Sequence, residues 1–139
     1  MYSKILVAND GSDGAFKALT TAFKLSLQAD AELHVLCVAE VSYFPGIIAE
    51  VEVERERADR RFAPMIERAK KLAALRGLTL ECHLLPGHPV PTIVNFVRTH
   101  GFDLLVIGFM GHSALYNRLI GSTTDWLVEL APCAVLVVK

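Results

Sequence analysis

The stretch Phe102–Thr123, FDLLVIGFMGHSALYNRLIGST, joins a short apolar run to a glycine-rich segment. The run Leu104–Ile107 lacks the polar alternation of a strand with one face in water, and it is typical of a strand buried on both faces of a parallel sheet. The segment that follows Gly108 is too long for a simple turn, and it ends at Gly121–Thr123, which predicts the start of a helix. The stretch therefore predicts a strand, a loop and a helix of an α/β fold.

Other apolar runs repeat this unit along the chain. The further predicted strands are Lys4–Ala8, Leu33–Ala39, Leu78–Leu85 and Ala134–Val138. Between them, apolar residues recur at helical spacing over residues 12–26, 90–97 and 127–131, with Ser12 as N-cap and Pro91 in a first turn. This alternation predicts one α/β domain over residues 1–139, with a five-stranded parallel sheet and helices on both faces.

The least regular segment is residues 40–77. Pro45-Gly46 predicts a turn, and the apolar stretch Val41–Ala49 is expected either to pack on the body or a partner, or to act as a mobile flap. Mixed charges over residues 50–61 are typical of a solvated helix face. Apolar helical spacing continues to Gly77, and Pro64 within it predicts a kink or a restart of the helix.

Composition excludes several classes of protein. With 14 basic and 15 acidic residues, the chain has no electrostatic basis for binding nucleic acid or an anionic membrane surface. No apolar run approaches the roughly 18 residues of a membrane span, and the N-terminus does not resemble a signal peptide. Three cysteines without CxxC spacing predict reduced thiols in the cytoplasm. The five histidines show no metal-ligand spacing, so no metal site is expected.

The predicted start of the last helix favours an anion. Backbone amides at a helix N-terminus are unpaired and carry partial positive charge, and glycine allows a phosphate to approach the backbone. His112 and Arg118 lie in the same loop and could each contact a phosphate, although a surface ion pair explains Arg118 equally well. The alternative is that Ser122 simply caps its own helix. The pattern is neither a Walker A loop nor the GxGxxG fingerprint.

Asp10 supplies a second indication, because it follows the first strand directly. In doubly wound sheets, ligands bind beyond the carboxyl ends of the strands, where the strand order reverses. A carboxylate there could bind ribose hydroxyls, an adenine amine or a phosphate-bound Mg²⁺. Its alternative role is to cap the first helix or to bond the loop that follows.

Four segments together resemble the universal stress protein family. They are KILVANDGS, ADAELHVLCVAE, GHPVPTIVNF and the C-terminal block that begins GFDLLVIG and ends APCAVLVVK. The most specific feature is Gly-x2-Gly-x9-Gly-Ser, from Gly108 to Ser122, a pattern that marks the ATP-binding members. The resemblance implies a Rossmann-like sheet with strand order 3-2-1-4-5, which places Asp10 and Gly108 at the switch point.

The resemblance also implies a binding site for ATP, possibly with Mg²⁺. The residues that it carries over to adenine and ribose are Ala8, Asn9, Asp10, Val38 and Gly108. Those that it carries over to the phosphates are Gly111, Gly121, Ser122 and Thr123, with His112 in the same loop.

The expected function is that of a small nucleotide-binding regulatory module rather than an efficient enzyme, because no convincing base for ATP hydrolysis is found. A dimeric scaffold or chaperone-like protein with a vestigial pocket, and a slow ATPase, remain the alternatives. The apolar strand Ala134–Val138 is expected at a sheet edge, where it invites pairing with another chain. The resemblance implies a homodimer formed through this strand.

Overall fold

The computed structural model describes residues 1–40, 48–109 and 123–139, without the side chains of residues 48–50. Predictions that concern residues 41–47 and 110–122 lie outside this part of the chain. The strands are β1 (Lys4–Ala8), β2 (Glu32–Ala39), β3 (Glu81–Pro86), β4 (Leu104–Gly108) and β5 (Ala134–Val138). The helices are α1 (Asp13–Ala29), α2 (Ile48–Ala74), α3 (Pro89–His100) and α5 (Thr123–Leu130).

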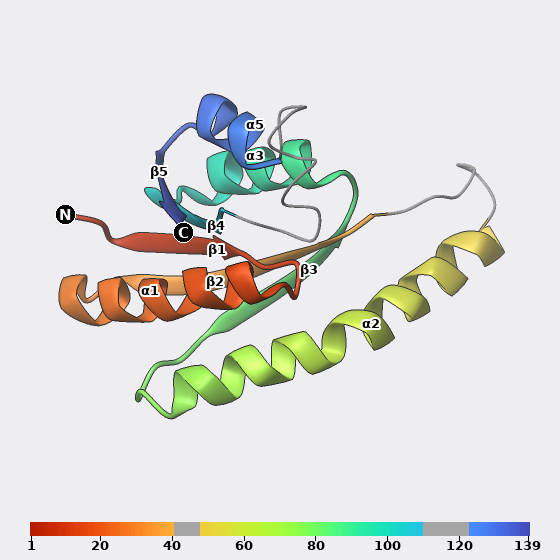
Figure 1. Cartoon of the computed structure of the whole chain (residues 1–139). Helices are drawn as coiled ribbons and strands as arrows, with labels where there is room; N and C mark the ends of the chain where they lie inside the picture. Colours follow the sequence, from red (N-terminus) through yellow and green to blue (C-terminus); the bar gives the residue numbers. More distant parts are fainter. Residues whose placement is uncertain (41–47, 110–122) are drawn as a thin grey trace.

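The five strands form one parallel sheet in the order β3-β2-β1-β4-β5, which confirms the predicted topology. Helices α1 and α2 cover one face, and α3 and α5 cover the other (Figure 1). The central strands β1 and β4 are apolar at nearly every position because both of their faces are covered. Since all strands run in one direction, their carboxyl ends share one edge of the sheet.

The hydrophobic core has two layers, one on each side of the sheet. The layer under α1 and α2 contains Ile5, Val7, Phe23 and Val106, all fully buried. The layer under α3 and α5 contains Leu6 and Leu36 among other residues. Successive residues of β1 thus enter opposite layers, as the two-residue period of a strand requires.

The first helix begins as the sequence predicts. Ser12 is its N-cap, and the Ser12 hydroxyl accepts a hydrogen bond of 3.2 Å from the backbone N–H of Ala15. The helix ends at Asp30, whose φ of 51° lies in the left-handed region and whose N–H donates to the Ser26 carbonyl. At each end of α1, a backbone group that the helix itself leaves unpaired therefore has a hydrogen-bond partner.

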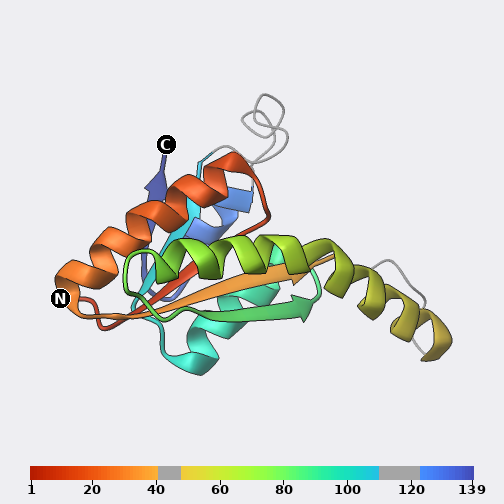
Figure 2. The ribbon, with the colours of Figure 1, turned by 90° about the horizontal axis from the view of Figure 1, so that it is seen from below.

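Helix α2 takes one of the two forms that Pro64 predicted, a bend without a restart. It is continuous from Ile48 to Ala74 with Pro64 inside it, so the helix does not restart. Figure 2 shows that it bends along its length, as expected where proline cannot donate to the carbonyl four residues earlier. Phe62, Ala69 and Ala73 anchor its C-terminal half in the core, whereas its N-terminal half projects from the body.

Strand β3 begins at Glu81, three residues later than predicted from the apolar run at Leu78. The Leu78 N–H donates to the Ala73 carbonyl at 3.0 Å, and Gly77 adopts a φ of 71°. These residues therefore close the C-terminus of α2 and cannot yet pair with β2. In the described residues, no helix is both long enough and apolar enough to cross a bilayer.

Candidate functional site

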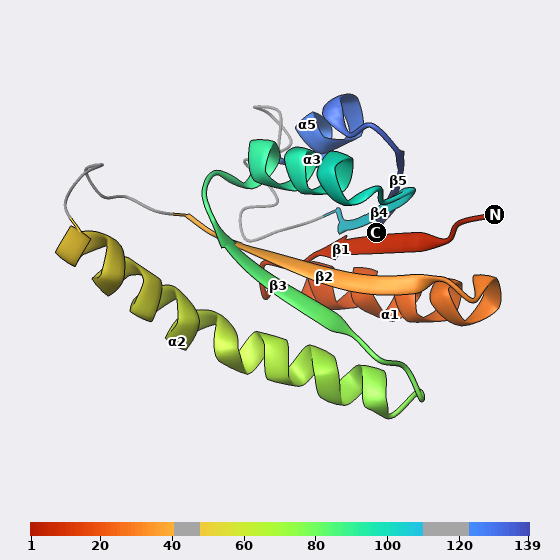
Figure 3. The same cartoon turned by 180° about the vertical axis from the view of Figure 1, so that it is seen from behind.

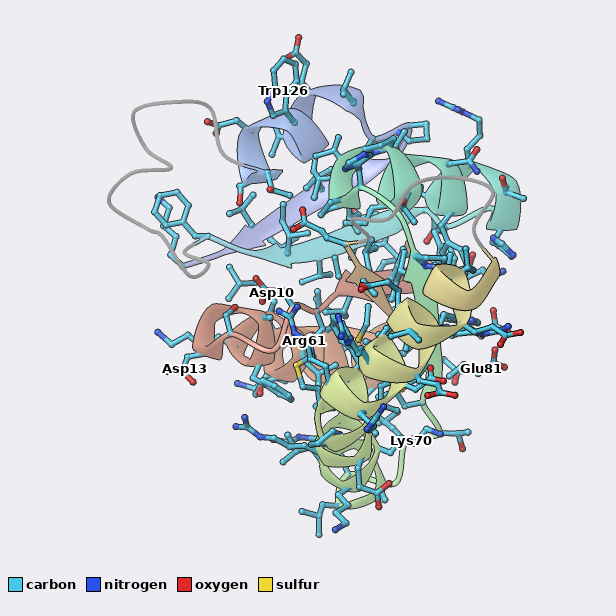
Figure 4. All side chains as sticks on the ribbon, turned by 90° about the vertical axis from the view of Figure 1, so that its right-hand side faces the viewer. Asp10, Asp13, Arg61, Lys70, Glu81 and Trp126 are labelled. Carbon is cyan, nitrogen blue, oxygen red and sulfur yellow. The ribbon has the colours of Figure 1, made fainter. Side chains whose placement is uncertain are left out.

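The carboxyl edge of the sheet gathers most of the described residues that the sequence assigns to the site. The ends of β1 and β4 are neighbours in the centre of the sheet. The hydroxyl of Thr124, in the first turn of α5, donates to the Gly108 carbonyl at 3.2 Å, which fixes the start of α5 beside the end of β4. Figure 4 looks onto this edge and shows Asp10 near its middle, above the start of α1.

The turn after β1 is built from side chains that bond backbone amides. The Asn9 carbonyl oxygen Oδ1 accepts from the N–H of Gly11 at 2.8 Å, and Asp10 Oδ1 accepts from the N–H of Ser12 at 3.0 Å. Gly11 has a φ of 84°, which glycine adopts without steric penalty. The loop-bonding role left open for Asp10 is therefore observed, and this bond fixes the carboxylate at the edge.

Asn9 is the most buried polar residue of this edge, with 4% of its surface exposed. Its backbone N–H donates to the Leu36 carbonyl at 3.0 Å, which extends the pairing of β1 with β2. Its side-chain amide nitrogen Nδ2 is buried and has no hydrogen-bond partner among the described residues. An unpaired buried amide destabilises the fold by about 1–3 kcal/mol, so this donor is suited to a bound acceptor.

Gly108 has a structural reason to be glycine. A Cβ built on it would lie 2.7 Å from the backbone C and O of Gly14 and 3.0 Å from the Ala15 N. Neither neighbour can move aside, because both belong to the backbone of α1. Gly108 thus allows the end of β4 to approach the first turn of α1, and it also leaves the backbone at the edge uncovered by a side chain.

Ala8 and Val38 supply the apolar part of the edge. Ala8 pairs with Leu36, and Val38 lies two residues further along β2, so both face the α3 and α5 side of the sheet. Each is half-buried, while Thr123 is exposed at the first position of α5.

The structure therefore brings Ala8, Asn9, Asp10, Val38, Gly108 and Thr123 to the same edge of the sheet. The other predicted residues lie outside the described part of the chain: Gly111, His112, Arg118, Gly121 and Ser122.

Cys37 lies near this edge but is not a nucleophile. Burial raises the pKa of its thiol to about 12, with Cys82 and Asp10 adding to the shift. The thiolate, which is the reactive form, is therefore absent near neutral pH. Cys37 is 1% exposed and acts as a small residue of the core.

A separate hollow of about 460 Å³ lies between α1 and the end of β5. It is lined in part by Asp13, Lys17, Arg68 and Lys139, and by none of the predicted site residues. Arg68 packs over the Phe16 ring at 3.8 Å from its centroid, so a cation–π contact already engages its charge. The hollow is open to solvent and lies next to the carboxyl edge, because Asp13 begins α1 and Val138 pairs with Gly108.

Comparison with known proteins places this geometry in a family. The universal stress protein family matches residues 1–139. The chain belongs to the universal stress protein family. Universal stress protein MJ0531 of Methanocaldococcus jannaschii is 33% identical to it, over 100% of this chain and 83% of the relative. Universal stress protein YxiE of Bacillus subtilis is 32% identical over the whole of both chains. The resemblance predicted from the four sequence segments is confirmed.

Solved structures agree with the fold. Universal stress protein UspA from Lactobacillus plantarum superposes with a TM-score of 0.84 at 29% identity, covering 99% of this chain and 98% of the other. A universal stress protein solved in complex with cAMP has a TM-score of 0.79 at 24% identity, with coverages of 99% and 97%. The second likeness shows the fold alone. Together they confirm a single-domain, Rossmann-like α/β architecture for this universal stress protein.

Proposed function

We propose that this universal stress protein binds ATP at the carboxyl edge of its sheet, as a regulatory module whose occupancy alters its shape or its partners. The observation that carries the proposal is the buried amide Nδ2 of Asn9, which has no hydrogen-bond partner among the described residues and is followed in the chain by the exposed Asp10. Nucleotides are held by such buried donors together with a carboxylate for the ribose. Proteins of the same fold that were solved with cAMP and with AMP support the ligand class.

The chemistry of the edge fits the parts of an adenine nucleotide. Ala8 and Val38 offer an apolar surface to the base, and Asn9 offers a hydrogen-bond donor. The Asp10 carboxylate accepts from ribose hydroxyls or shares a phosphate-bound Mg²⁺. We assign the phosphates to the glycine-rich segment and the amides at the start of α5, with Gly111, His112, Gly121, Ser122 and Thr123 as contacts.

Binding, rather than turnover, is the function that we assign. Hydrolysis of ATP requires an oriented water, charge compensation at the γ-phosphate and a group that orients the nucleophile. Asp10 already accepts a backbone hydrogen bond within its own turn, which favours a positioning role for this carboxylate. A scaffold with an empty pocket and a slow ATPase are the two competing functions.

Replacement of Asp10 by asparagine tests the site. Asp10→Asn keeps an oxygen that can accept from Ser12 but removes the charge, so we expect the ATP dissociation constant to rise about tenfold or more. Asp13→Asn is the matched control, because it removes the same charge three residues away on an exposed position of α1. Isothermal titration calorimetry with ATP, AMP and cAMP measures both variants against the parent protein.

The outcomes separate the three functions. Mass spectrometry of ligand released from the purified protein by heat should detect an adenine nucleotide. Equal ATP affinity in Asp10→Asn and Asp13→Asn would refute the site, and absence of nucleotide binding in the parent protein would favour the scaffold. Phosphate release well above that of a Gly121→Val variant would favour the ATPase.

We further propose that two copies associate through β5, and that the protein acts in the cytoplasm. Strand β5 lies at one edge of the sheet, and its apolar side chains are only partly buried. Trp126, Val128 and Leu130 on the neighbouring α5 are about half exposed. Pairing of the same edge from two copies would cover this surface and close the assembly by two-fold symmetry.

A further inference from the structure

A cluster of two histidines and a glutamate lies toward the amino ends of β2 and β3, away from the proposed nucleotide edge. His34 pairs with Glu81 across the two strands, and Leu36 pairs with His83. His34, Glu81 and His83 therefore lie on the same face of the sheet, since residues two apart along a strand share a face. Figure 3 shows β3 as the outer strand of this pair.

The donor atoms of this cluster converge. His34 Nδ1 lies 2.9 Å from His83 Nε2 and 3.4 Å from a carboxylate oxygen of Glu81. The two ring planes are within 6° of each other, and the short N···N distance shows that the rings meet edge to edge. One ligand atom from each residue lies within 4.8 Å of the other two. Tetrahedral zinc with bonds of about 2.0–2.1 Å holds its ligand atoms about 3.3 Å apart, and the separations of 2.9 Å and 3.4 Å lie on either side of that spacing.

We propose that His34, His83 and Glu81 form a binding site for a divalent cation of the zinc type. Two imidazole nitrogens and one carboxylate are a ligand set that suits Zn²⁺ and leaves its fourth position to water. The 2.9 Å contact between the imidazoles requires a proton on one of the two facing nitrogens. When the cation binds, that proton is carried by the other nitrogen of the same ring, which for His34 is Nε2 facing Glu32. Both facing nitrogens then offer a lone pair, each imidazole stays neutral, and no electron is transferred.

The surroundings of His34 match those of a metal ligand. A carboxylate oxygen of Glu32 lies 3.5 Å from His34 Nε2, the ring nitrogen that faces away from His83. Histidine ligands commonly direct their second nitrogen at a carboxylate, which fixes the tautomer and increases the basicity of the ligating nitrogen. The side chain of His34 is 9% exposed, and its Nε2 has no closer partner among the described residues.

Aromatic packing limits the motion of both rings. Phe102 meets His34 edge-on with centroids 5.0 Å apart, and Phe96 lies 4.9 Å from His83. The two imidazoles are therefore held in the position in which their facing nitrogens meet.

The local charge favours a cation. Glu32 and Glu81 contribute two negative charges beside the rings. The positive group of Lys4 is engaged beside the cluster, where it donates to the His100 carbonyl at 2.7 Å and lies over the Phe102 ring. A cation bound to His34, His83 and Glu81 would join β3 to β2, so its binding free energy would stabilise the edge strand of the folded protein.

Zinc binding by the tag-free, full-length protein tests the site. We expect equilibrium dialysis with elemental analysis to give one high-affinity Zn²⁺ per chain in the parent protein. His83→Gln should weaken this site at least tenfold, and so should Glu81→Gln. His88→Gln is the matched control, because His88 is exposed and its side chain makes no capping bond at the start of α3.

Two further measurements distinguish a metal bound at this cluster from a metal bound elsewhere on the protein. Co²⁺ should give the visible absorption of a tetrahedral site in the parent and in His88→Gln, and lose it in His83→Gln. Zn²⁺ should raise the melting temperature of the parent but not of His83→Gln, with circular dichroism confirming that the variant is folded. Equal zinc affinity in His83→Gln and His88→Gln, or no zinc bound by the parent, would overturn the proposal.

Discussion

At the scale of single residues, the edge of the sheet is shaped by how closely the backbone of α1 approaches the strand ends. Gly108 meets the backbone of Gly14, and Gly11 lies under Met65 of α2, where a Cβ would collide with the Met65 Sδ. At Gly108 glycine is a packing requirement that exists with or without a ligand, because the obstructing atoms belong to the backbone. At Gly11 the positive φ of 84° favours glycine, since the end of the Met65 side chain can move aside. Gly108, the first glycine of the sequence pattern, is therefore explained by packing as well as by the proposed nucleotide binding.

Gly108→Ala separates these two roles. We expect it to lower the free energy of unfolding by about 1–3 kcal/mol, because its Cβ would be forced against the backbone of α1. Urea denaturation without any nucleotide measures this change. Gly77→Asn is the control, since a Cβ at Gly77 would meet nothing within 4 Å and asparagine tolerates its left-handed conformation. A Gly108→Ala variant as stable as the control would contradict the packing argument.

At the scale of elements, Asp103 links the start of β1 to the segment before β4. Its carboxylate accepts from the backbone N–H of Ser3 at 2.8 Å and of Lys4 at 3.0 Å, and from the Ser3 hydroxyl at 3.0 Å. Partial burial opposes ionisation, but these hydrogen bonds outweigh it and hold the pKa of Asp103 below its usual value.

This lowered pKa gives a pH dependence with a defined sign. The unfolded chain takes up a proton at Asp103 near pH 3.8, while the folded chain does so at a lower pH. Stability from this group is therefore fully present above about pH 4 and is lost as pH falls through the folded pKa. Asp103→Asn should be less stable than the parent by about 1 kcal/mol at pH 7, with a smaller difference at pH 3.

Urea midpoints measured from pH 3 to pH 7 check this prediction. Asp30→Asn serves as control, because Asp30 is an exposed left-handed cap at which asparagine is equally tolerated. A difference between parent and Asp103→Asn that stays constant with pH would contradict the assigned cause.

Most elements were predictable from local patterns. Continuous apolar runs predicted the bounds of β1, β2, β4 and β5 to within one residue. This works because a parallel sheet is covered on both faces, so its strands carry apolar residues without polar alternation. The apolar run at Leu78 placed β3 too early, since its first residues serve to end α2. Pro64 predicted a kink or a restart, and α2 bends without restarting, because packing of Phe62 and Ala69 on either side of the proline holds the helix together.

Sequence spacing predicted part of the carboxyl edge at which we propose nucleotide binding, and it missed the histidine cluster. Asp10 and Gly108 were expected at one edge because strand order 3-2-1-4-5 makes β1 and β4 neighbours, and the structure confirms that adjacency. Recognising that the Asn9 amide has no partner among the described residues requires knowing that it is buried, and the spacing of residues in a sequence does not show burial. His34 and His83 are 49 residues apart and meet only through the register of β2 with β3.

At the scale of the whole molecule, the sheet ends at β5 in an edge flanked by apolar side chains of α5. We expect Val128→Glu to raise the dissociation constant of the proposed homodimer at least tenfold, because it places a charge in a surface that dimerisation would desolvate. The side chain is 53% exposed, so the folded monomer should tolerate the change. Sedimentation velocity over a range of protein concentrations measures the effect.

The control for this prediction is Leu75→Glu, which adds the same charge at an 82% exposed apolar residue just after α2. It should leave the sedimentation profile unchanged. Identical behaviour of the two variants, or a parent protein that sediments as a monomer at all concentrations, would refute association through β5.

Strand β2 runs the full distance between the two proposed sites, with His34 near its beginning and Val38 near its end. Strand β2 is hydrogen-bonded on both sides, to β1 and to β3. We therefore expect a ligand at one end of β2 to leave the affinity at the other end unchanged. Either could be redesigned, tethered to a support or loaded with a probe while the other continues to work at its native affinity.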